Sequence, residues 1–173
     1  FVDENTPDQD LVSASLQDVD NFGHIIDRYE KPLDRYLMSI SGATKEDRED
    51  LLQEIFLSVY QNLRSYNHDK KFSSWIYRIA HNKSISWWRK VKKESLDISL
   101  TEHEDFVSSI FSENDVQEHL DQVDAEGAIN HALGSIKDEY RQLLVLKFVE
   151  DKSYKEIADI TSSTVGTVGT RIK

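Results

Sequence analysis

The residues best suited to chemistry in this sequence lie in one stretch, residues 72–94, which reads FSSWIYRIAHNKSISWWRKVKKE. It holds all three tryptophans of the chain and six lysines or arginines, with no acidic residue before Glu94. Aromatic rings stack on unpaired nucleic-acid bases, which contributes about 1–3 kcal/mol per base, and lysine and arginine bind the phosphates. The stretch therefore predicts a surface for unpaired bases.

A single amphipathic helix would position these side chains, because helical residues follow one another at about 100°. One face carries Phe72, Trp75, Ile76, Ile79, Ala80 and Trp87, and another carries Arg78, Asn82, Arg89 and Lys92. Trp87 and Trp88 lie about 100° apart, so they do not both point at one core. Two interpretations of Trp75 stay open, a core residue or a ring that contacts bases.

Charge is arranged in blocks along a chain whose formal net charge is −11. Residues 64–93 hold nine lysines or arginines against one acid, whereas residues 94–126 hold eleven acids and no lysine or arginine. This contrast indicates an anion-binding surface next to a tether that repels the same anion, and the alternative is a solvated helix face beside a disordered linker. A linker of about 28 residues, 94–121, spans up to roughly 95 Å, enough to separate two domains.

The remaining elements predict an all-α fold, since two prolines and six glycines interrupt 173 residues of helical periodicity. We expect a helix over 21–38 with a kink or break at Pro32, and a second helix with Thr44 as its N-cap. The second helix buries a stripe formed by Leu52, Ile55, Phe56, Val59 and Leu63.

The C-terminal third predicts two helices from Val123 onward, joined near residues 134–139. Two short helices joined by a tight turn follow, with a small residue, Ala158, where they could approach closely. Spacing alone fits a helix-turn-helix and a plain helical bundle equally well. The last helix presents small hydroxyls and cations, which suit phosphates and base edges and favour the helix-turn-helix. These residues are Thr167, Thr170, Arg171 and Lys173.

Several function classes find no support in the sequence. The chain has no cysteine, its six histidines form no metal-binding spacing, and the motifs of phosphate loops and serine hydrolases are absent. We therefore expect no cofactor, no metal and no catalytic residue. No apolar run could span a bilayer and the start is acidic, so we expect a cytoplasmic protein that does not insert into a membrane. The missing initial methionine and the end at Lys173 inside a helical pattern suit a fragment.

Three stretches, in this order, resemble the sigma-70 family in its extracytoplasmic-function group, group IV. EDLLQEIFLSVYQNL resembles the polymerase-binding helix of region 2, and FSSWIYRIAHNKSISWWRK resembles the segment that melts and reads the minus-ten element. LVLKFVEDKSYKEIADITSSTVGTVGTRIK resembles region 4, which reads the minus-thirty-five element. The resemblance implies an acidic N-terminal tail (1–20), a region 2 helical bundle (21–93), an acidic linker (94–121) and a region 4 helix-turn-helix (122–173) truncated at its C-terminus.

The resemblance also implies site residues and partners. The partners are core RNA polymerase, through its beta-prime clamp helices and beta flap, promoter DNA, and an anti-sigma factor whose existence stays open. Core polymerase would meet Asp50, Gln53, Glu54, Leu57 and Gln61. The minus-ten element would meet Tyr66, Asn67, His68, Lys70, Lys71, Trp75, Arg78, Asn82, Trp88, Arg89 and Lys92, with Asn82 reaching a base pocketed by the loop. The minus-thirty-five element would meet Ser163, Thr164, Thr167, Thr170, Arg171 and Lys173.

The sequence departs from the family pattern at a few positions. Ser162 and Ser163 occupy the turn where glycine and an apolar residue are usual, so the turn must tolerate a less permissive backbone. Gly169 stands where a basic or polar residue is common, and it costs a helix about 1 kcal/mol. The acidic linker would either mimic a nucleic-acid backbone in the polymerase channel or act as a plain spacer.

Our leading hypothesis is a sigma factor that directs core polymerase to promoters and promotes opening of the duplex. The alternative is a helix-turn-helix transcriptional regulator whose N-terminal helices bind a partner. A helical enzyme is the third possibility, and no sequence feature favours it.

Overall fold

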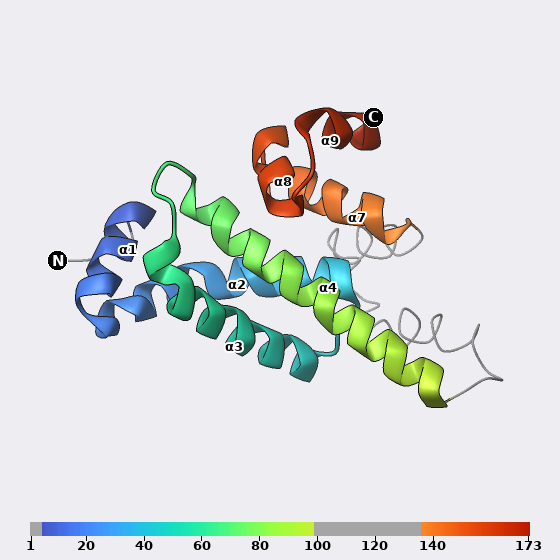
Figure 1. Cartoon of the computed structure of the whole chain (residues 1–173), viewed down its shortest axis with the longest axis horizontal. Helices are drawn as coiled ribbons and strands as arrows, with labels where there is room; N and C mark the ends of the chain where they lie inside the picture. The colour runs from blue at the N-terminus through green and yellow to red at the C-terminus, as the bar shows by residue number, and fades with distance from the viewer. Residues whose placement is uncertain (1–4, 99–135) are drawn as a thin grey trace, which may run out of the picture.

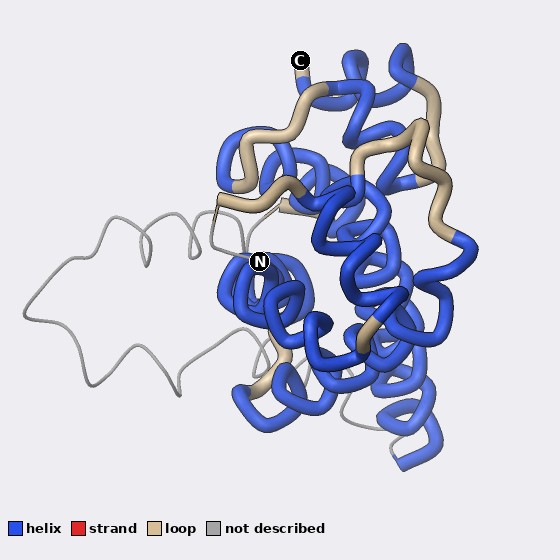
Figure 2. Tube along the Cα trace, turned by 90° about the vertical axis from the view of Figure 1, so that its left-hand side faces the viewer, coloured by secondary structure: helices blue, strands red, loops and turns tan. Residues whose placement is uncertain are grey.

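The computed structural model describes residues 5–98 and 136–173, and every regular element in these two ranges is helical (Figures 1 and 2). The prediction of an all-helical fold is confirmed. The longer helices are α1 (Asp8–Gln17), α2 (Phe22–Ser41), α3 (Lys45–Asn62), α4 (Phe72–Ile98), α7 (Asp138–Leu144), α8 (Tyr154–Thr161) and α9 (Val165–Ile172). Single turns cover Val19–Asn21 and Leu63–Ser65, and a π-helical turn, Val145–Val149, extends α7. Most of the predicted linker and the helix predicted from Val123 lie outside the described residues.

The N-terminal unit, residues 5–98, is a bundle in which α2, α3 and α4 pack against one another around one core. The predicted stripes are buried: Leu33 and Leu37 of α2, Ile55 of α3 and Ile76 of α4 are all fully enclosed. Burying such a side chain contributes about 1.5–3 kcal/mol, so these stripes hold the bundle together. Helix α2 continues through Pro32 to Ser41, so the break considered at Pro32 does not occur.

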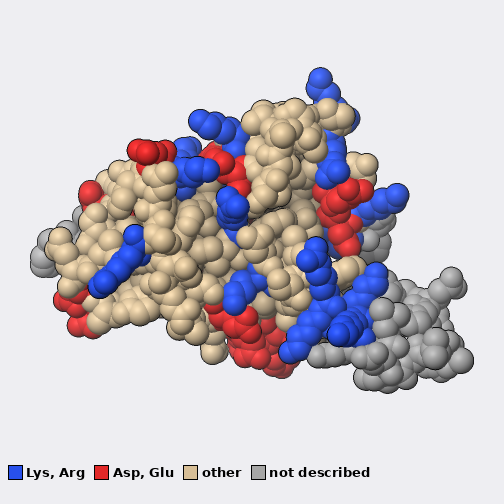
Figure 3. All heavy atoms as spheres, viewed as in Figure 1, with Lys and Arg blue, Asp and Glu red and all other residues tan. Residues whose placement is uncertain are grey.

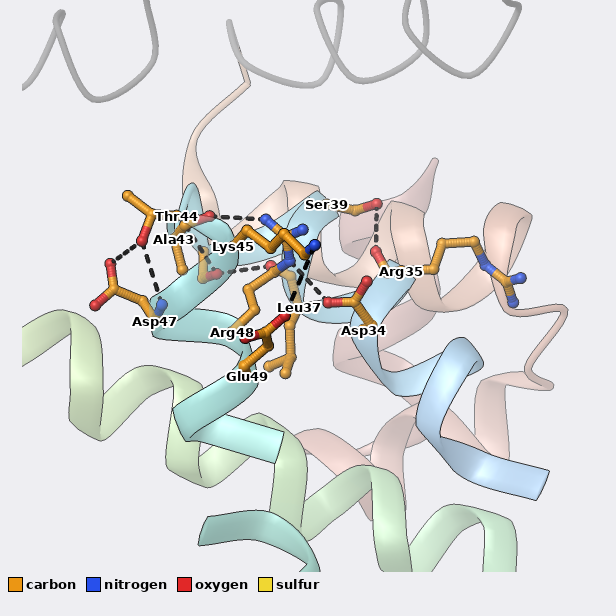
Figure 4. A network of polar contacts seen from close by, with 11 residues as sticks. Asp34, Arg35, Leu37, Ser39, Ala43, Thr44, Lys45, Asp47, Arg48 and Glu49 are labelled. Atoms are coloured by element: carbon orange, nitrogen blue, oxygen red, sulfur yellow. Dashed lines mark hydrogen bonds and ion pairs between the residues drawn. The ribbon is translucent and has the colours of Figure 1, made fainter. Parts of the chain in front are cut away.

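The junction of α2 and α3 is fixed by a short polar network (Figure 4). Gly42 ends α2 with φ 63°, a left-handed conformation in which glycine carries no Cβ penalty. Thr44 is the N-cap of α3, as predicted, and its hydroxyl oxygen accepts a hydrogen bond from the backbone N–H of Asp47 at 3.2 Å. Arg48 donates to Asp34 at 2.8 Å and to the carbonyl oxygen of Ala43 at 3.0 Å, tying the two helices together.

Helix α1 lies within residues 1–20, where an acidic tail was predicted, so the prediction is wrong for this segment. Leu11 and Val12 are buried, so α1 belongs to the core of the N-terminal unit. Its first residue, Asp8, accepts hydrogen bonds from Arg28 at 2.8 Å and from the hydroxyl of Tyr29 at 2.6 Å. Two neighbouring apolar residues, Leu11 and Val12, are too short a pattern to predict a helix from sequence.

The C-terminal unit, residues 136–173, packs three short helices around a small core. Helix α8 begins with a complete capping box, in which Ser153 and Glu156 each satisfy a backbone N–H of the other. It ends at Ser162, which adopts a left-handed conformation with φ 54°. Helix α9 follows after a tight turn, so the predicted helix-turn-helix outline is present. The core side chains are Leu143, Val145, Leu146, Ile157, Ala158, Ile160 and Val168.

The two units are in contact, although the predicted linker is long enough to separate them. Helix α8 lies against α4, and the π-helical turn after α7 lies against α2 (Figure 1). In Figure 1 the C-terminal unit lies along one side of the N-terminal bundle, next to α2 and α4. Among the helices of residues 5–98 and 136–173, none is long and apolar enough to cross a membrane.

Candidate nucleic-acid and partner interfaces

The loop between α3 and α4 rests on a base of aromatic rings. The ring of Tyr66 lies 5.3 Å from the ring of Phe72 and 5.4 Å from that of Trp75. Its hydroxyl donates to the carbonyl oxygen of Lys70, and Gln9 of α1 donates to the carbonyl oxygen of His68 at 3.0 Å. The loop backbone is therefore anchored from below and from the side.

The predicted loop residues divide into supporting and exposed groups. Tyr66 is only 4% exposed, so its ring cannot stack on a base in this conformation, and it supports the loop instead. The other four predicted loop residues are exposed: Asn67, His68, Lys70 and Lys71. Both lysines already have carboxylate partners from α8, since Lys70 lies 3.1 Å from Asp159 and Lys71 lies 3.2 Å from Glu156.

The outer face of α4 is cationic, as predicted. The residues predicted for the polar face are all exposed: Arg78, Asn82, Arg89 and Lys92. Lysine and arginine side chains gather over the second half of α4 (Figure 3). Trp88 is half-buried, and the ammonium group of Lys92 lies 5.0 Å from its ring centre. A ring with a cation over its face is a surface of the kind that binds single-stranded nucleic acid.

Trp75 and Trp87 pack against the core instead. Trp75 is half-buried beside Tyr66, so part of its ring packs against the core and part is accessible to a base. Both interpretations of Trp75, as a core residue and as a ring that contacts bases, therefore stay open. Trp87 lines a groove of about 480 Å³ between α3 and α4, together with Asn82 and Lys90. Asn82 lies ten residues beyond Phe72, about 15 Å along the helix axis. The structure thus places Asn82 in this groove, and no contact joins it to the loop that it was predicted to reach.

The face of α3 that points away from the core is the candidate partner surface. All five residues predicted for it are exposed: Asp50, Gln53, Glu54, Leu57 and Gln61. Leu57 is 57% exposed, and with Gln53 it lines a groove of about 620 Å³ between α2 and α3. Glu54 is paired with Lys83 of α4 at 3.2 Å.

Apolar residues that the sequence analysis did not select complete this groove. Val19 is 55% exposed and Tyr60 is 46% exposed, and Ile26 and Phe56 line the groove between them. The signal was present in the sequence, because Leu57 and Tyr60 interrupt the polar face of α3 with large apolar side chains. Contiguous exposed apolar area rimmed by polar residues is typical of a protein-binding site.

The six residues predicted for the minus-thirty-five element lie on α9, on the turn before it and, in the case of Lys173, directly after it. Thr164 is the N-cap of α9, and its hydroxyl accepts a hydrogen bond from the backbone N–H of Thr167 at 3.1 Å. The hydroxyl of Thr170 donates to the carbonyl oxygen of Gly166, so the helix itself uses part of the predicted polar face. Arg171 lies 3.5 Å from Glu139 of α7. Ser163 is half-buried and Lys173 is exposed.

Two buried polar contacts escaped the sequence analysis. The first joins the hydroxyl of Tyr36 to Nδ1 of His81 at 3.0 Å inside the N-terminal core, where burial lowers the pKa of His81 to about 4. The second is Glu150, whose side chain is 3% exposed between the two units. Neither has a local signature, because each partner comes from a distant segment.

No group of three or more His, Asp or Glu side chains that could hold a metal ion occurs in residues 5–98 and 136–173. Burial opposes ionisation of Glu156, but hydrogen bonds from Ser153 and the ion pair with Lys71 outweigh it and lower the pKa of this carboxyl. Glu156 therefore remains an anion at the edge of the loop cations.

Comparison with known proteins decides the family. The profile of Sigma-70 region 2 matches residues 25–94, and that of Sigma-70 region 4 matches residues 126–173. The chain belongs to the extracytoplasmic-function group of the sigma-70 family. It is 33% identical to the ECF RNA polymerase sigma factor SigW of Bacillus subtilis, over 90% of this chain and 84% of that one. It is also 33% identical to SigM of the same organism, over 79% of this chain and 78% of SigM.

Two solved structures share the fold over most of this chain. CnrH, solved in complex with the cytosolic domain of CnrY, aligns with a TM-score of 0.68 and 20% identity, over 95% of this chain and 89% of CnrH. The sigma factor RpoE of Bartonella quintana, solved with the anti-sigma factor NepR, aligns with a TM-score of 0.69 and 21% identity, over 88% of this chain and 89% of RpoE. Region 2 of this family corresponds to the N-terminal unit and region 4 to the C-terminal unit.

Proposed function

We propose that this chain is a promoter-specificity subunit, which directs core RNA polymerase to particular promoters and promotes opening of the duplex. One observation carries the proposal: a single chain of this family combines a cationic, aromatic helix suited to unpaired bases with a helix-turn-helix suited to duplex DNA. It acts by binding and does not itself catalyse a reaction. Its place of action is the cytoplasm, where polymerase and promoter meet.

Core polymerase binds the outer face of α3. The proposed contacts are Asp50, Gln53, Glu54, Leu57 and Gln61, with the adjoining apolar groove as the buried centre of the interface. A protein interface of this kind needs an apolar anchor surrounded by polar groups. Leu57 is the exposed apolar side chain at the middle of this set, so it is the proposed anchor for the clamp helices of the largest subunit.

Promoter DNA binds both units. The exposed loop residues and the cationic face of α4 hold the separated minus-ten strand, with Trp88 and Lys92 as the accessible aromatic and cationic pair. Unstacking a base costs a few kcal/mol, which stacking and phosphate contacts offset. Helix α9 enters the major groove of the minus-thirty-five duplex, where Arg171 and Lys173 meet phosphates or bases. The beta flap of polymerase would hold the C-terminal unit in register.

A further proposed partner is a protein that covers the polymerase-binding and DNA-binding surfaces. RpoE of Bartonella quintana was solved with an anti-sigma factor, and that structure shares this fold. We extend this to the present chain as a proposed anti-sigma partner. The alternative function, a regulator that binds DNA without polymerase, is less well supported because it leaves the match to region 2 without a use.

Run-off transcription with purified core polymerase tests the proposal. The intact chain should bind core and direct initiation from defined promoters. Leu57→Glu should weaken core binding at least tenfold, since it places a charge at an apolar anchor. Leu16→Glu is the matched control, because Leu16 of α1 is also partly exposed, at 38%, yet lies outside the groove. Tight binding to duplex promoter with no binding to core would overturn the proposal in favour of the regulator.

A further inference from the structure

We propose that the first turn of α1 positions the loop between α3 and α4, with Gln9 as a positioning residue that acts through the loop backbone. The inference rests on the proposed function, in which this loop reads the minus-ten element. Helix α1 lies beside the loop in Figure 1 and contacts both α4 and the turn that precedes the loop. A segment in which an acidic tail was predicted thus supports the proposed DNA-reading surface.

The contact joins the side chain of Gln9 to the backbone at the middle of the loop. The amide nitrogen of Gln9, Nε2, donates a hydrogen bond to the carbonyl oxygen of His68 at 3.0 Å. The two residues lie 59 positions apart in the chain, so the bond fixes the loop to a separate helix. A carbonyl oxygen can only accept, which means that position 9 must supply a donor for the contact to form.

Hydrogen bonds within the loop set its local shape around this contact. The backbone N–H of Lys70 donates to the carbonyl oxygen of Asn67 at 3.0 Å, and the backbone N–H of Asp69 donates to the side-chain oxygen of Asn67 at 2.9 Å. The second bond is an Asx turn, in which a side chain replaces a backbone acceptor. The hydroxyl of Tyr66 donates to the carbonyl oxygen of Lys70. These bonds shape the turn, and Gln9 fixes its place on the bundle.

The engaged carbonyl oxygens determine what the loop offers to a nucleic acid. The carbonyl oxygens of His68 and Lys70 each accept a hydrogen bond from a protein side chain, so their partial negative charge is satisfied within the protein. The side chains of Asn67, His68 and Lys70 are exposed. A loop already held in one conformation loses less conformational entropy when it binds, and this raises its affinity for an unpaired base.

Gln9 is itself held in place by the residue before it, Asp8. The carboxylate of Asp8 accepts hydrogen bonds from Arg28 at 2.8 Å and from the hydroxyl of Tyr29 at 2.6 Å, and both donors belong to α2. The ring of Tyr29 packs edge-on against Phe72, the first residue of α4, with 5.7 Å between the ring centres. The first turn of α1 and the end of the loop are therefore fixed to the same part of α2.

Amide hydrogen exchange, measured by NMR on the full chain, tests the contact without DNA or polymerase. The amide protons of Asp69 and Lys70 are bonded within the turn, so their exchange rates report how often the loop opens. Gln9→Met keeps the length of the side chain but lacks the donor, so it should raise both rates about fivefold. Gln9→Lys retains an N–H donor and should restore both rates toward those of the parent. Gln17→Met, at an exposed position of the same helix, is the matched control and should change neither.

Binding of the minus-ten strand tests what the contact does for the proposed function. The probe is the single-stranded non-template oligonucleotide of a promoter from which the parent chain initiates in the run-off assay. In complex with core polymerase, Gln9→Met should bind this oligonucleotide about threefold more weakly, because the loop must first be ordered. Its affinity for core should not change, since Gln9 lies outside the groove between α2 and α3. An equal loss of core binding would indicate a general loss of structure and would overturn the positioning role.

The two measurements separate this inference from the proposed function. Unchanged exchange in Gln9→Met, or an equal increase in Gln17→Met, overturns the positioning role. If exchange rises as expected but the chain directs no run-off transcript, the contact between α1 and the loop stands and the sigma-factor proposal fails. If the chain directs transcription but Gln9→Met changes neither the exchange nor the oligonucleotide binding, the positioning role fails alone.

Discussion

The two units of this protein are stabilised in different ways. The N-terminal bundle has helices of up to 27 residues and contributes Leu11, Ile25, Tyr36 and several other large side chains to the fully buried core. The C-terminal unit has helices of seven or eight residues, each shorter than an isolated helix needs to be stable. It relies on caps, tight turns and its contact with α4. The bundle is therefore stabilised mainly by its own core, whereas the C-terminal unit depends on local caps and on its contact with the bundle.

A substitution that leaves a cavity in the core of either unit should give the largest difference in stability between the two units. Leu33→Ala removes a fully buried side chain from the bundle and should lower its unfolding free energy by about 2–5 kcal/mol. Urea unfolding followed by tryptophan fluorescence reports on this unit, because all three tryptophans lie in α4.

The matched change in the other unit is Ile157→Ala, which also removes a fully buried side chain. It should melt α8 and lower the helical circular-dichroism signal at low urea while the fluorescence transition moves less. If Ile157→Ala shifted the fluorescence transition as far as Leu33→Ala does, the two units would form one cooperative core and the comparison would fail.

Acid should act on the bundle in particular, through His81. Burial lowers its pKa to about 4 in the folded chain, against an ordinary value of 6.5, so the unfolded chain binds the proton first as pH falls. This contribution to stability is therefore complete above pH 6.5 and is lost between pH 6.5 and 4, amounting to about 3 kcal/mol.

The fluorescence transition at pH 7, 5.5 and 4 measures the effect of His81. His81→Gln should flatten this part of the pH dependence, whereas His24→Gln, at an exposed position of α2, should leave it as in the parent chain. Equal pH dependence in His81→Gln and the parent would assign the acid sensitivity to other groups.

Most of the bundle could be predicted, because the sequence patterns that specify its helices each lie within a single helix. The stripe of α3, the cap at Thr44 and the cationic face of α4 follow from periodicity within one helix, and the structure confirms each. Periodicity alone left a helix-turn-helix and a plain bundle open, and the hydroxyl and cationic side chains of the last helix favoured the helix-turn-helix. Even the strained turn at Ser162 was foreseen, since a serine stands where the family has glycine, and its φ of 54° agrees.

The contacts between distant segments were not predictable. Nothing in the neighbouring sequence distinguishes Glu150 from an ordinary surface acid. In the structure it is enclosed by Arg35 and Tyr77, which lie 115 and 73 residues away along the chain. Tyr66 was expected to meet a base, but packing against Phe72 and Trp75 buries it. Periodicity assigns a residue to a face of its own helix and gives no information about which other element covers that face.

Removing a helix cap should have an effect of intermediate size, and it tests whether the helices of the two units are stabilised differently. Ser153→Ala removes the hydroxyl of the capping box at α8, and Thr44→Ala removes the N-cap of α3. Each should cost about 1 kcal/mol locally. Because α8 has 8 residues and α3 has 18, only Ser153→Ala should visibly reduce helix content, as measured by circular dichroism at 25 °C. A loss of helix in Thr44→Ala as large as in Ser153→Ala would contradict the idea that the bundle stabilises its own helices.

The smallest expected effect concerns the turn between α8 and α9. Ser162 ends α8 with φ 54°, a conformation in which a Cβ atom is unfavourable and glycine is preferred. Ser162→Gly should therefore stabilise the C-terminal unit by about 0.5 kcal/mol, after the greater freedom of glycine in the unfolded chain is subtracted. Ser162→Ala keeps a Cβ atom and is the matched control, so it should give no gain. Thermal unfolding followed by circular dichroism distinguishes the two, and a gain in Ser162→Ala as large as in Ser162→Gly would show that the hydroxyl, and not the backbone conformation, limits the stability of this turn.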